Sequence, residues 1–325
     1  MENDLIHQQS CRIATSSSLE LPALIRHAGP SASRRFVEFF TANIRNPGTR
    51  GAYARAVARF CRWCATGGIG LDGVDAVVVA TYIEGLGLQL SRPTVKLHLA
   101  AIRMLFDYLV TGQVVPVNPA AAVRGPKHVV RKGKTPVLTA GEARLLLDSI
   151  DTRTIGGLRD RALIGLMVYS FARVSAVVGM NVEDYFPQGR RMWFRLHEKG
   201  GRRHEVPAHH NAEAYVDEYV EAARIGEEKR SPLFRTLDRN RSLTDRRIHR
   251  SDVLRMVKRR ARRADLPPST SCHTFRATGI TAYLDNGGCL EHAQRIAAHE
   301  SARTTKLYDR TGDTISLDEI ERIVI

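Results

Sequence analysis

The stretch SCHTFRATGITAYLDNGGCLEHAQRIAAHESARTTKLYDR, residues 271–310, decides how this chain is interpreted. It opens with the pattern H-x-x-R, formed by His273 and Arg276, and closes with Tyr308, nine positions after His299. The run TGITAYLDNGG, residues 278–288, predicts a helix that ends in a glycine turn. Taken alone, Tyr308 resembles the half-buried surface tyrosines of many proteins. Whether it does chemistry depends on what the rest of the chain supplies.

Length and charge indicate two domains and a polyanionic partner. A chain of 325 residues, 43% hydrophobic and 26% charged, is long enough for two domains that each bury a core. The formal net charge is +15; residues 1–135 hold 17 Lys and Arg against 8 Asp and Glu, and residues 136–325 hold 32 against 26. Because both halves are basic, a clamp around a phosphate backbone fits the pattern. Ribosomal, chromatin and membrane-surface proteins share such a charge.

The chain carries no pattern of a membrane or secreted protein. No run approaches the ~18 apolar residues of a membrane span, and residues 1–18, MENDLIHQQSCRIATSSS, lack the order of a secretory signal. We therefore expect a cytoplasmic protein. The five cysteines are an odd number scattered along the chain, which favours reduced thiols over a disulfide framework.

The amino-terminal part predicts a loose arm followed by a helical domain. Residues 1–30 lack periodicity, and residues 31–123 have a helical pattern. In TRGAYARAVARFCRWC, residues 49–64, the apolar residues recur every three or four positions, with Thr49 placed as the N-cap. In SRPTVKLHLAAIRMLFDYLV, residues 91–110, Ser91 can cap the helix, and one apolar stripe contains Val95, Leu99, Ile102, Phe106 and Leu109.

The opposite face of that second helix is basic. It carries Arg92, Lys96 and Arg103, which we expect to bind DNA, although a merely solvated face has the same composition.

A linker and a mixed domain follow. Residues 124–137, rich in Pro, Gly and basic residues, predict the linker, and residues 138–325 form the second domain. This domain opens with a capping box, Thr139 to Glu142. RRMWFRLHEKGGRRHEVP, residues 190–207, alternates apolar and polar residues and turns at KGG, which predicts a β-hairpin. Most of the rest is helical in pattern, so the fold class is mainly α with a small β-hairpin sheet (α+β).

Three short patterns resemble cofactor motifs but fail on detail. Cys61 and Cys64 form a CxxC without a second pair of ligands at zinc spacing. In HEVPAH, residues 204–209, the second histidine comes one residue late for a zinc protease, and Pro207 would break the required helix. The sequence GxxxxGK[ST] does not occur. The chain thus implies no metal, no cofactor and no use of ATP.

The second domain contains the parts that cleavage of a phosphodiester without a metal requires. These parts are a nucleophile, cations for the non-bridging oxygens, an acid for the leaving oxygen and a group that moves protons. Arginine suits the second role because its planar fork grips phosphate oxygens with two hydrogen bonds. The candidates are, in chain order, Arg173, Lys199, His273, Arg276, His299 and Tyr308.

This ordered set resembles the tyrosine recombinases, the integrase family typified by lambda integrase. The family's catalytic domain is entered through a segment similar to TPVLTAGEARLLL, residues 135–147, and its core-binding domain is helical like the amino-terminal part. The resemblance covers roughly residues 35–325. It implies that Tyr308 attacks the scissile phosphate and forms a 3′-phosphotyrosyl ester. Arg173 and Arg276 would hold the phosphate oxygens and Lys199 would protonate the 5′-oxygen.

The resemblance also assigns the histidines and exposes one departure. His273 would act as the base or orienting group for Tyr308, and His299 would bind the phosphate. The family usually has an acidic residue three positions after its first arginine, and here that position is Ala176. Support for Arg173 or the neighbouring histidine must then come from elsewhere in the chain.

Further features extend the resemblance to DNA contacts and assembly. Residues 234–266 hold twelve Lys and Arg against four Asp, and in the family a helix here contacts DNA, which makes Lys258, Arg259 and Arg262 candidates. SLDEIERIVI, residues 316–325, has the pattern of a terminal amphipathic helix. The family docks such a helix into a neighbouring protomer, so we expect a homotetramer on two double-stranded recombination sites, with accessory DNA-bending proteins as further possible partners.

Two alternatives stay open on the sequence. A type IB topoisomerase uses the same chemistry as a monomer, which a docking helix argues against. A DNA-binding regulator with an inactive site would not need all six residues, and Ala176 is the one sign of decay. The preferred prediction is a site-specific recombinase associated with the nucleoid, acting in integration, excision or resolution of a mobile element or plasmid.

Overall fold

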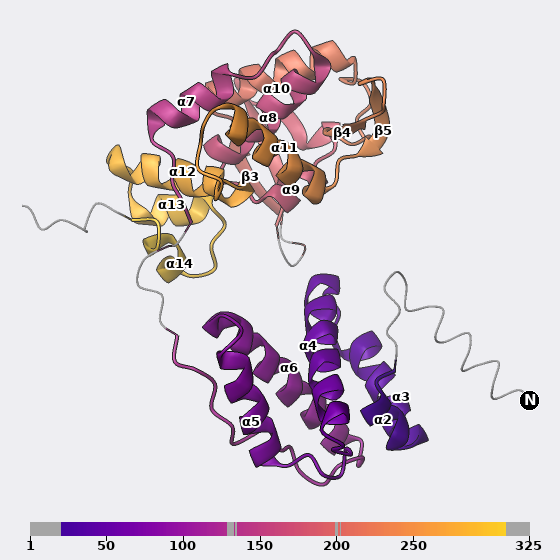
Figure 1. Ribbon diagram of the computed structural model, residues 1–325. Helices are drawn as coiled ribbons and strands as arrows, with labels where there is room; N and C mark the ends of the chain where they lie inside the picture. The colour runs from indigo at the N-terminus through magenta and orange to yellow at the C-terminus, as the bar shows by residue number, and fades with distance from the viewer. Residues whose placement is uncertain (1–20, 129–132, 134, 199–200, 202, 310–325) are drawn as a thin grey trace, which may run out of the picture. The chain divides into compact units, whose positions relative to one another are not determined.

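The computed structural model describes residues 21–128, 133, 135–198, 201 and 203–309. The chain divides into two compact units, Met1–Val129 and Val130–Ile325, called here the N-terminal and C-terminal units (Figure 1). Within the described ranges, no helix has both the length and the apolar character that crossing a bilayer requires.

The N-terminal unit is built of helices around an aromatic core. Its largest buried side chains include Phe39, Phe40, Phe60 and Phe106, which interlock edge to face. The five residues of the stripe predicted for residues 91–110 are all buried, which confirms that helix and its inward face. The elements are α2 (Ala23–His27), α3 (Pro30–Glu38), the π-helical η1 (Phe39–Asn43), α4 (Pro47–Thr66), α5 (Ala76–Gly87) and α6 (Arg92–Thr111).

Two local expectations for this unit are wrong. The loose arm was expected to reach residue 30, but α2 already buries Leu24 and Ile25 against the core, and these apolar contacts order a segment too short for periodicity to reveal. Helix α4 is capped by Asn46 and not by Thr49, because the Asn46 side chain accepts hydrogen bonds from the backbone of Gly48 and Thr49 at 2.9 and 3.1 Å. Pro47 then occupies the first helical turn.

The C-terminal unit combines helices with two small antiparallel sheets, which confirms the α+β fold class, although only one hairpin sheet was predicted. Its first half contains α7 (Ala140–Asp148), α8 (Ile155–Tyr169), α9 (Val174–Gly179), the 3₁₀ turn η2 (Val182–Asp184), β1 (Tyr185–Gln188), β2 (Arg191–His197) and β3 (Arg203–Pro207). Its second half contains α10 (His210–Ala223), β4 (Arg235–Leu237), β5 (Leu243–Arg247), α11 (Arg250–Arg263), α12 (Cys272–Asp285), α13 (Leu290–Ile296) and α14 (Ala302–Lys306). The capping box of Thr139 and Glu142 is present at the start of α7.

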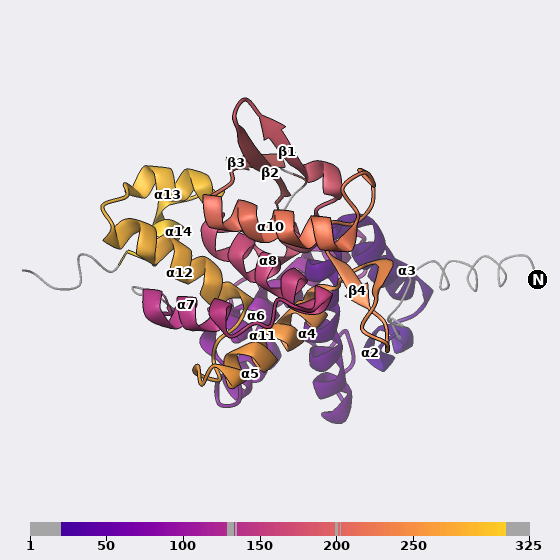
Figure 2. The ribbon, with the colours of Figure 1, turned by 90° about the horizontal axis from the view of Figure 1, so that it is seen from above.

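Helix α8 is the buried centre of this unit. Helices α10 and α12 both pack against it (Figures 1 and 2). Two glycines permit these contacts: a Cβ atom on Gly165 would lie 2.6 Å from the Tyr215 ring of α10, and one on Gly279 of α12 would lie 2.0 Å from the Val168 carbonyl oxygen. Helix α12 is thereby held against the end of α8.

The predicted hairpin is present as β2 and β3, joined antiparallel, and β1 adds a third strand on the other side of β2. Phe194 and Leu196 of β2 face the core, as the alternation predicted. Figure 2 shows this sheet at the edge of the C-terminal unit. The pairing of β4 with β5 was not foreseen, because β5 consists mostly of polar residues and shows no alternation.

Candidate active site

The first arginine of the predicted set follows a tight turn. Helix α8 ends at Tyr169, and Phe171 adopts a left-handed backbone with φ of 54°, which reverses the chain. Arg173 then stands at the N-cap of α9, with its side chain 36% exposed. The turn therefore presents a guanidinium group to solvent from an otherwise apolar segment.

Arg276, one helical turn after His273 on α12, is the largest fully buried side chain of the described residues. Its Nη1 donates to the carbonyl oxygen of Phe171, and its Nη2 donates to that of Ala297 at 2.6 Å. The guanidinium group therefore fastens the turn before Arg173 to the end of α13. Burial, followed by the charge of Arg173, lowers its pKa to about 10, so it remains a cation at neutral pH.

His273 and Tyr308 are in direct contact, as the sequence pattern required. The distance from His273 Nε2 to the Tyr308 hydroxyl oxygen is 2.9 Å. The His273 ring keeps access to solvent, yet partial burial and then the charges of Arg276 and Arg173 lower its pKa. Burial raises the pKa of Tyr308, although the two arginines oppose that rise. Both groups are therefore neutral at pH 7, and the imidazole can accept the phenolic hydrogen.

His299 lies against the same tyrosine. Its ring is parallel to that of Tyr308, with centroids 5.9 Å apart and an interplanar angle of 6°. Its Nδ1 is 2.8 Å from the hydroxyl oxygen of Thr305, a fully buried residue of α14. Burial, then the charge of Arg276, lowers the pKa of His299 to about 3, so the ring is neutral.

Helix α14 positions the tyrosine. The segment between His299 and Tyr308 contains this short helix. The backbone N–H of Tyr308 donates to the carbonyl of Thr305 at 2.9 Å, and its own carbonyl accepts from the Thr281 hydroxyl at 3.1 Å. The backbone of Tyr308 is therefore held from two directions, and the residue is only 8% exposed.

Glu198 is a member of this cluster that the sequence reasoning missed. Its carboxylate accepts a hydrogen bond from Arg173 Nη1 at 2.5 Å, and the residue is 7% exposed. A signal existed, because Glu198 continues the inward-facing alternation of Phe194 and Leu196, and a carboxylate on a buried face needs a partner. Lys199, the next residue, lies outside the described residues.

Only part of the basic face predicted on α6 is available to a ligand. Arg92 and Lys96 are exposed. Arg103 donates from Nε to the carbonyl of Ala120 at 2.9 Å and from Nη2 to that of Val123. Arg103 thus fastens the segment after α6 and is less free than the other two side chains to meet a ligand.

The basic side chains predicted on α11 also differ from one another. Lys258 Nζ donates to the carbonyl of Pro268 at 2.5 Å, and Arg259 Nη2 lies 3.7 Å from a carboxylate oxygen of Asp160. Arg262 is exposed, and its side chain makes no hydrogen bond or ion pair with any described residue. Arg262 is therefore the most available of the three for an anionic ligand.

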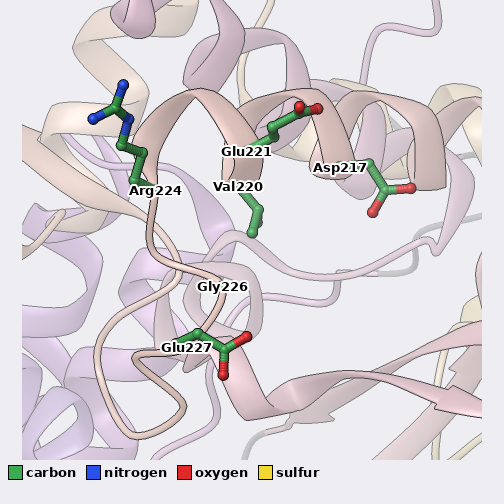
Figure 3. A pocket seen from close by; sticks show the side chains of 6 residues that line it. All are labelled: Asp217, Val220, Glu221, Arg224, Gly226 and Glu227. Atoms are coloured by element: carbon green, nitrogen blue, oxygen red, sulfur yellow. The ribbon is translucent and has the colours of Figure 1, made fainter.

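An open hollow along the end of α10 is acidic, in contrast to the basic faces of α6 and α11 (Figure 3). It contains three carboxylates against one guanidinium group, so it would repel a phosphate backbone. Its lining residues are Asp217, Val220, Glu221, Arg224, Gly226 and Glu227.

In the described part of the chain, no group of three or more His, Cys, Asp or Glu residues is placed to hold a metal ion. Cys61 and Cys64 pack inside the N-terminal unit, and burial raises their pKa values to about 12 and about 11. Thiols with such pKa values are protonated at neutral pH, and both side chains pack within the hydrophobic core of this unit. The pair is therefore part of the core.

Comparisons with known proteins identify the family of this chain. Residues 136–314 match the phage integrase family, and residues 35–113 match the phage integrase N-terminal SAM-like domain. The chain is 29% identical over 284 residues to the tyrosine recombinase XerC of Pelobacter propionicus, covering 86% of this chain and 88% of that protein. It is 30% identical over 241 residues to XerC of Syntrophus aciditrophicus, covering 73% and 76%.

Solved structures share the fold. One is the XerH site-specific recombinase bound to its difH substrate, with a TM-score of 0.64 and 16% identity, covering 97% of this chain and 92% of that one. Another is a lambda integrase dimer bound to a COC′ core site, with a TM-score of 0.65 and 18% identity, covering 87% and 79%. The chain belongs to the phage integrase family and is a tyrosine recombinase, an enzyme of site-specific DNA strand exchange.

Proposed function

We propose that this recombinase cuts and rejoins DNA through a 3′-phosphotyrosyl intermediate on Tyr308. The observation that carries the proposal is the 2.9 Å contact between the Tyr308 hydroxyl and His273 Nε2. Arg173 and Arg276 lie close enough for their charges to act on the pKa values of both groups. These contacts support the proposal that Tyr308 is the nucleophile, that His273 accepts its proton and that the two arginines would bind the phosphate.

The proposed cleavage step balances without an external cofactor. The Tyr308 oxygen bonds to phosphorus, its proton passes to His273, and the bond from phosphorus to the 5′-oxygen breaks. Lys199 supplies the proton that the departing oxygen takes up. In the second step a 5′-hydroxyl from the partner strand attacks the ester and releases the tyrosine, so the bond energy is kept and ATP is not needed.

Binding of the DNA phosphate would make His273 a better proton acceptor. In the absence of DNA, Arg276 and Arg173 hold the pKa of His273 down. A phosphate bound between the two guanidinium groups offsets their charge and raises that pKa toward its ordinary value. The same arginines stabilise the charge of the transition state, where one lost donor costs about 3–4 kcal/mol.

His299 would donate a hydrogen bond to the phosphate as a neutral ring. With a pKa of about 3 it carries one N–H at neutral pH. If the Thr305 hydroxyl donates to Nδ1, 2.8 Å away, the ring hydrogen lies on Nε2 and is available to the substrate. Thr305 would thus select the tautomer of His299.

The relatives support a proposal for the substrate, the biological role and the assembly of this protein. XerH and lambda integrase are described on DNA recombination sites, and we infer the same substrate here, with the N-terminal unit as a core-binding domain. We further infer integration, excision or resolution of a mobile element or plasmid in the nucleoid. Residues 316–325, outside the described residues, would couple four protomers on two sites, aided by accessory DNA-bending proteins.

Covalent trapping tests this proposal. DNA sites would be selected with the Tyr308→Phe variant from a pool of random-sequence duplexes, and then offered to the wild-type protein as nicked duplexes without metal or ATP. We expect an SDS-resistant protein–DNA adduct with wild type and with Tyr283→Phe. This control variant also loses one tyrosine hydroxyl, but on α12 and not at position 308. Adduct formation by Tyr308→Phe at the wild-type level would contradict the proposal.

A further inference from the structure

The site lacks a carboxylate at the position where the family usually places one. Three residues after Arg173 stands Ala176, which is fully buried in α9, and α9 contains no acidic residue. Without a carboxylate, the buried Arg276 and the partly exposed Arg173 would repel each other before the phosphate arrives. The long side chain of Arg173 would also lose its fixed orientation.

A carboxylate reaches Arg173 from a different element. Helix α9 packs against β2, and Glu198 follows the last residue of that strand. Glu198 accepts from Arg173 Nη1 at 2.5 Å, with its side chain 5% exposed against 36% for that of Arg173. Charge-assisted bonds of this kind are among the stronger and more directional contacts in proteins.

The contact leaves Arg173 able to bind a phosphate. Among the described residues, the bond from Nη1 to Glu198 is the one hydrogen bond of the Arg173 guanidinium group, so Nε and Nη2 stay open. The negative charge of Glu198 also acts on Arg276, whose pKa it raises. The carboxylate thus offsets the repulsion between the two cations without covering the edge that a phosphate would use.

We propose that Glu198 is a positioning residue of the strand-cleaving site, which orients Arg173 from the β2 end and replaces the acidic residue absent at position 176. The inference rests on the proposed phosphotyrosyl function. Glu198 acts through Arg173 and touches no reacting atom, so its removal should slow cleavage while DNA binding and folding stay as they are.

The test measures single-turnover cleavage of a selected site at saturating protein, together with DNA affinity and thermal unfolding. We expect Glu198→Gln to cleave roughly tenfold more slowly, and Glu198→Ala still more slowly, with unchanged DNA affinity. The matched control is Glu205→Gln, which removes a carboxylate paired with Arg195 at 2.8 Å on the same hairpin. This control should cleave at the wild-type rate.

A double-mutant cycle separates positioning from a general structural effect. In an Arg173→Lys background, Glu198→Gln should add less than a twofold further loss, because the group it orients is gone. A full tenfold loss in that background, an equal loss in Glu205→Gln, or a Glu198→Gln variant that cleaves as fast as wild type or faster would overturn the proposal. If wild type forms no adduct at all, it is the phosphotyrosyl function that fails.

Discussion

Replacing Gly279 with alanine should loosen the helix contact that places Arg276. The new Cβ would lie 2.0 Å from the Val168 carbonyl oxygen and 2.8 Å from the Phe171 ring, whereas ordinary contacts begin at 3.4 Å. Helix α12 must therefore move away from the end of α8. Overpacking of this kind costs about 1–3 kcal/mol, and the higher helix propensity of alanine returns about 1 kcal/mol, which leaves a net loss of about 0–2 kcal/mol.

The same movement should also slow cleavage, by more than the loss of stability alone would suggest. Arg276 lies one turn before Gly279 on α12 and bonds to the carbonyls of Phe171 and Ala297. Misplacing a catalytic group by about 1 Å can cost roughly a hundredfold in rate. We expect Gly279→Ala to lower the thermal midpoint by up to roughly 8 °C and to slow adduct formation by roughly a hundredfold.

Circular dichroism on heating and single-turnover adduct formation measure these two effects. Gly85→Ala on α5 is the matched control, because a Cβ added to this helical residue would have no atom within 4 Å. The control should unfold at or above the wild-type midpoint. A Gly279→Ala variant with wild-type stability and wild-type cleavage would refute the reasoning that the approach of α12 to α8 sets Arg276.

Three further predictions concern the histidines and the basic faces. Because the pKa of folded His299 is about 3, the unfolded chain binds more protons than the folded one below pH ~6.5, and the free energy of unfolding falls as the pH is lowered toward 3. His299→Gln should reduce this dependence of the free energy of unfolding on pH, measured by urea titrations. An unchanged dependence would contradict the argument that burial lowers the pKa of His299. Thr305→Val should slow cleavage roughly tenfold with unchanged DNA affinity, measured in single turnovers, and wild-type cleavage would show that the hydroxyl does not fix the tautomer. Arg262→Ala should weaken DNA binding and reduce by about 1 the slope of the logarithm of the binding constant against the logarithm of the salt concentration. Arg103→Ala should instead lower the thermal midpoint, because its side chain bonds to backbone carbonyls. The reverse pattern in binding and melting assays would contradict these two assignments.

The sequence was most informative where chemistry restricts residue types. The resemblance to the tyrosine recombinases, carried in part by H-x-x-R and the nine-residue spacing, predicted that four residues lie together: His273, Arg276, His299 and Tyr308. The structure brings them together on α12 and the segments around α13 and α14. Periodicity also predicted α6 and the hairpin of β2 and β3.

What the sequence could not provide depends on contacts between distant segments. Glu198 is next to Lys199 in the chain, but its pairing with Arg173 arises only because α9 packs on β2. Arg103 carries the same charge as Arg92, and only the folded chain directs it to the carbonyls of Ala120 and Val123. Local patterns do not encode such pairings.

The chemical identity of the trapped protein–DNA bond tests the central claim most directly. The adduct would be digested with protease and nuclease, and the peptide that carries a nucleotide would be identified by mass spectrometry. The account predicts a 3′-nucleotide esterified to Tyr308 and a free 5′-hydroxyl on the released strand, which polynucleotide kinase can label without phosphatase. A nucleotide on another residue, or a 5′-linked ester, would contradict it.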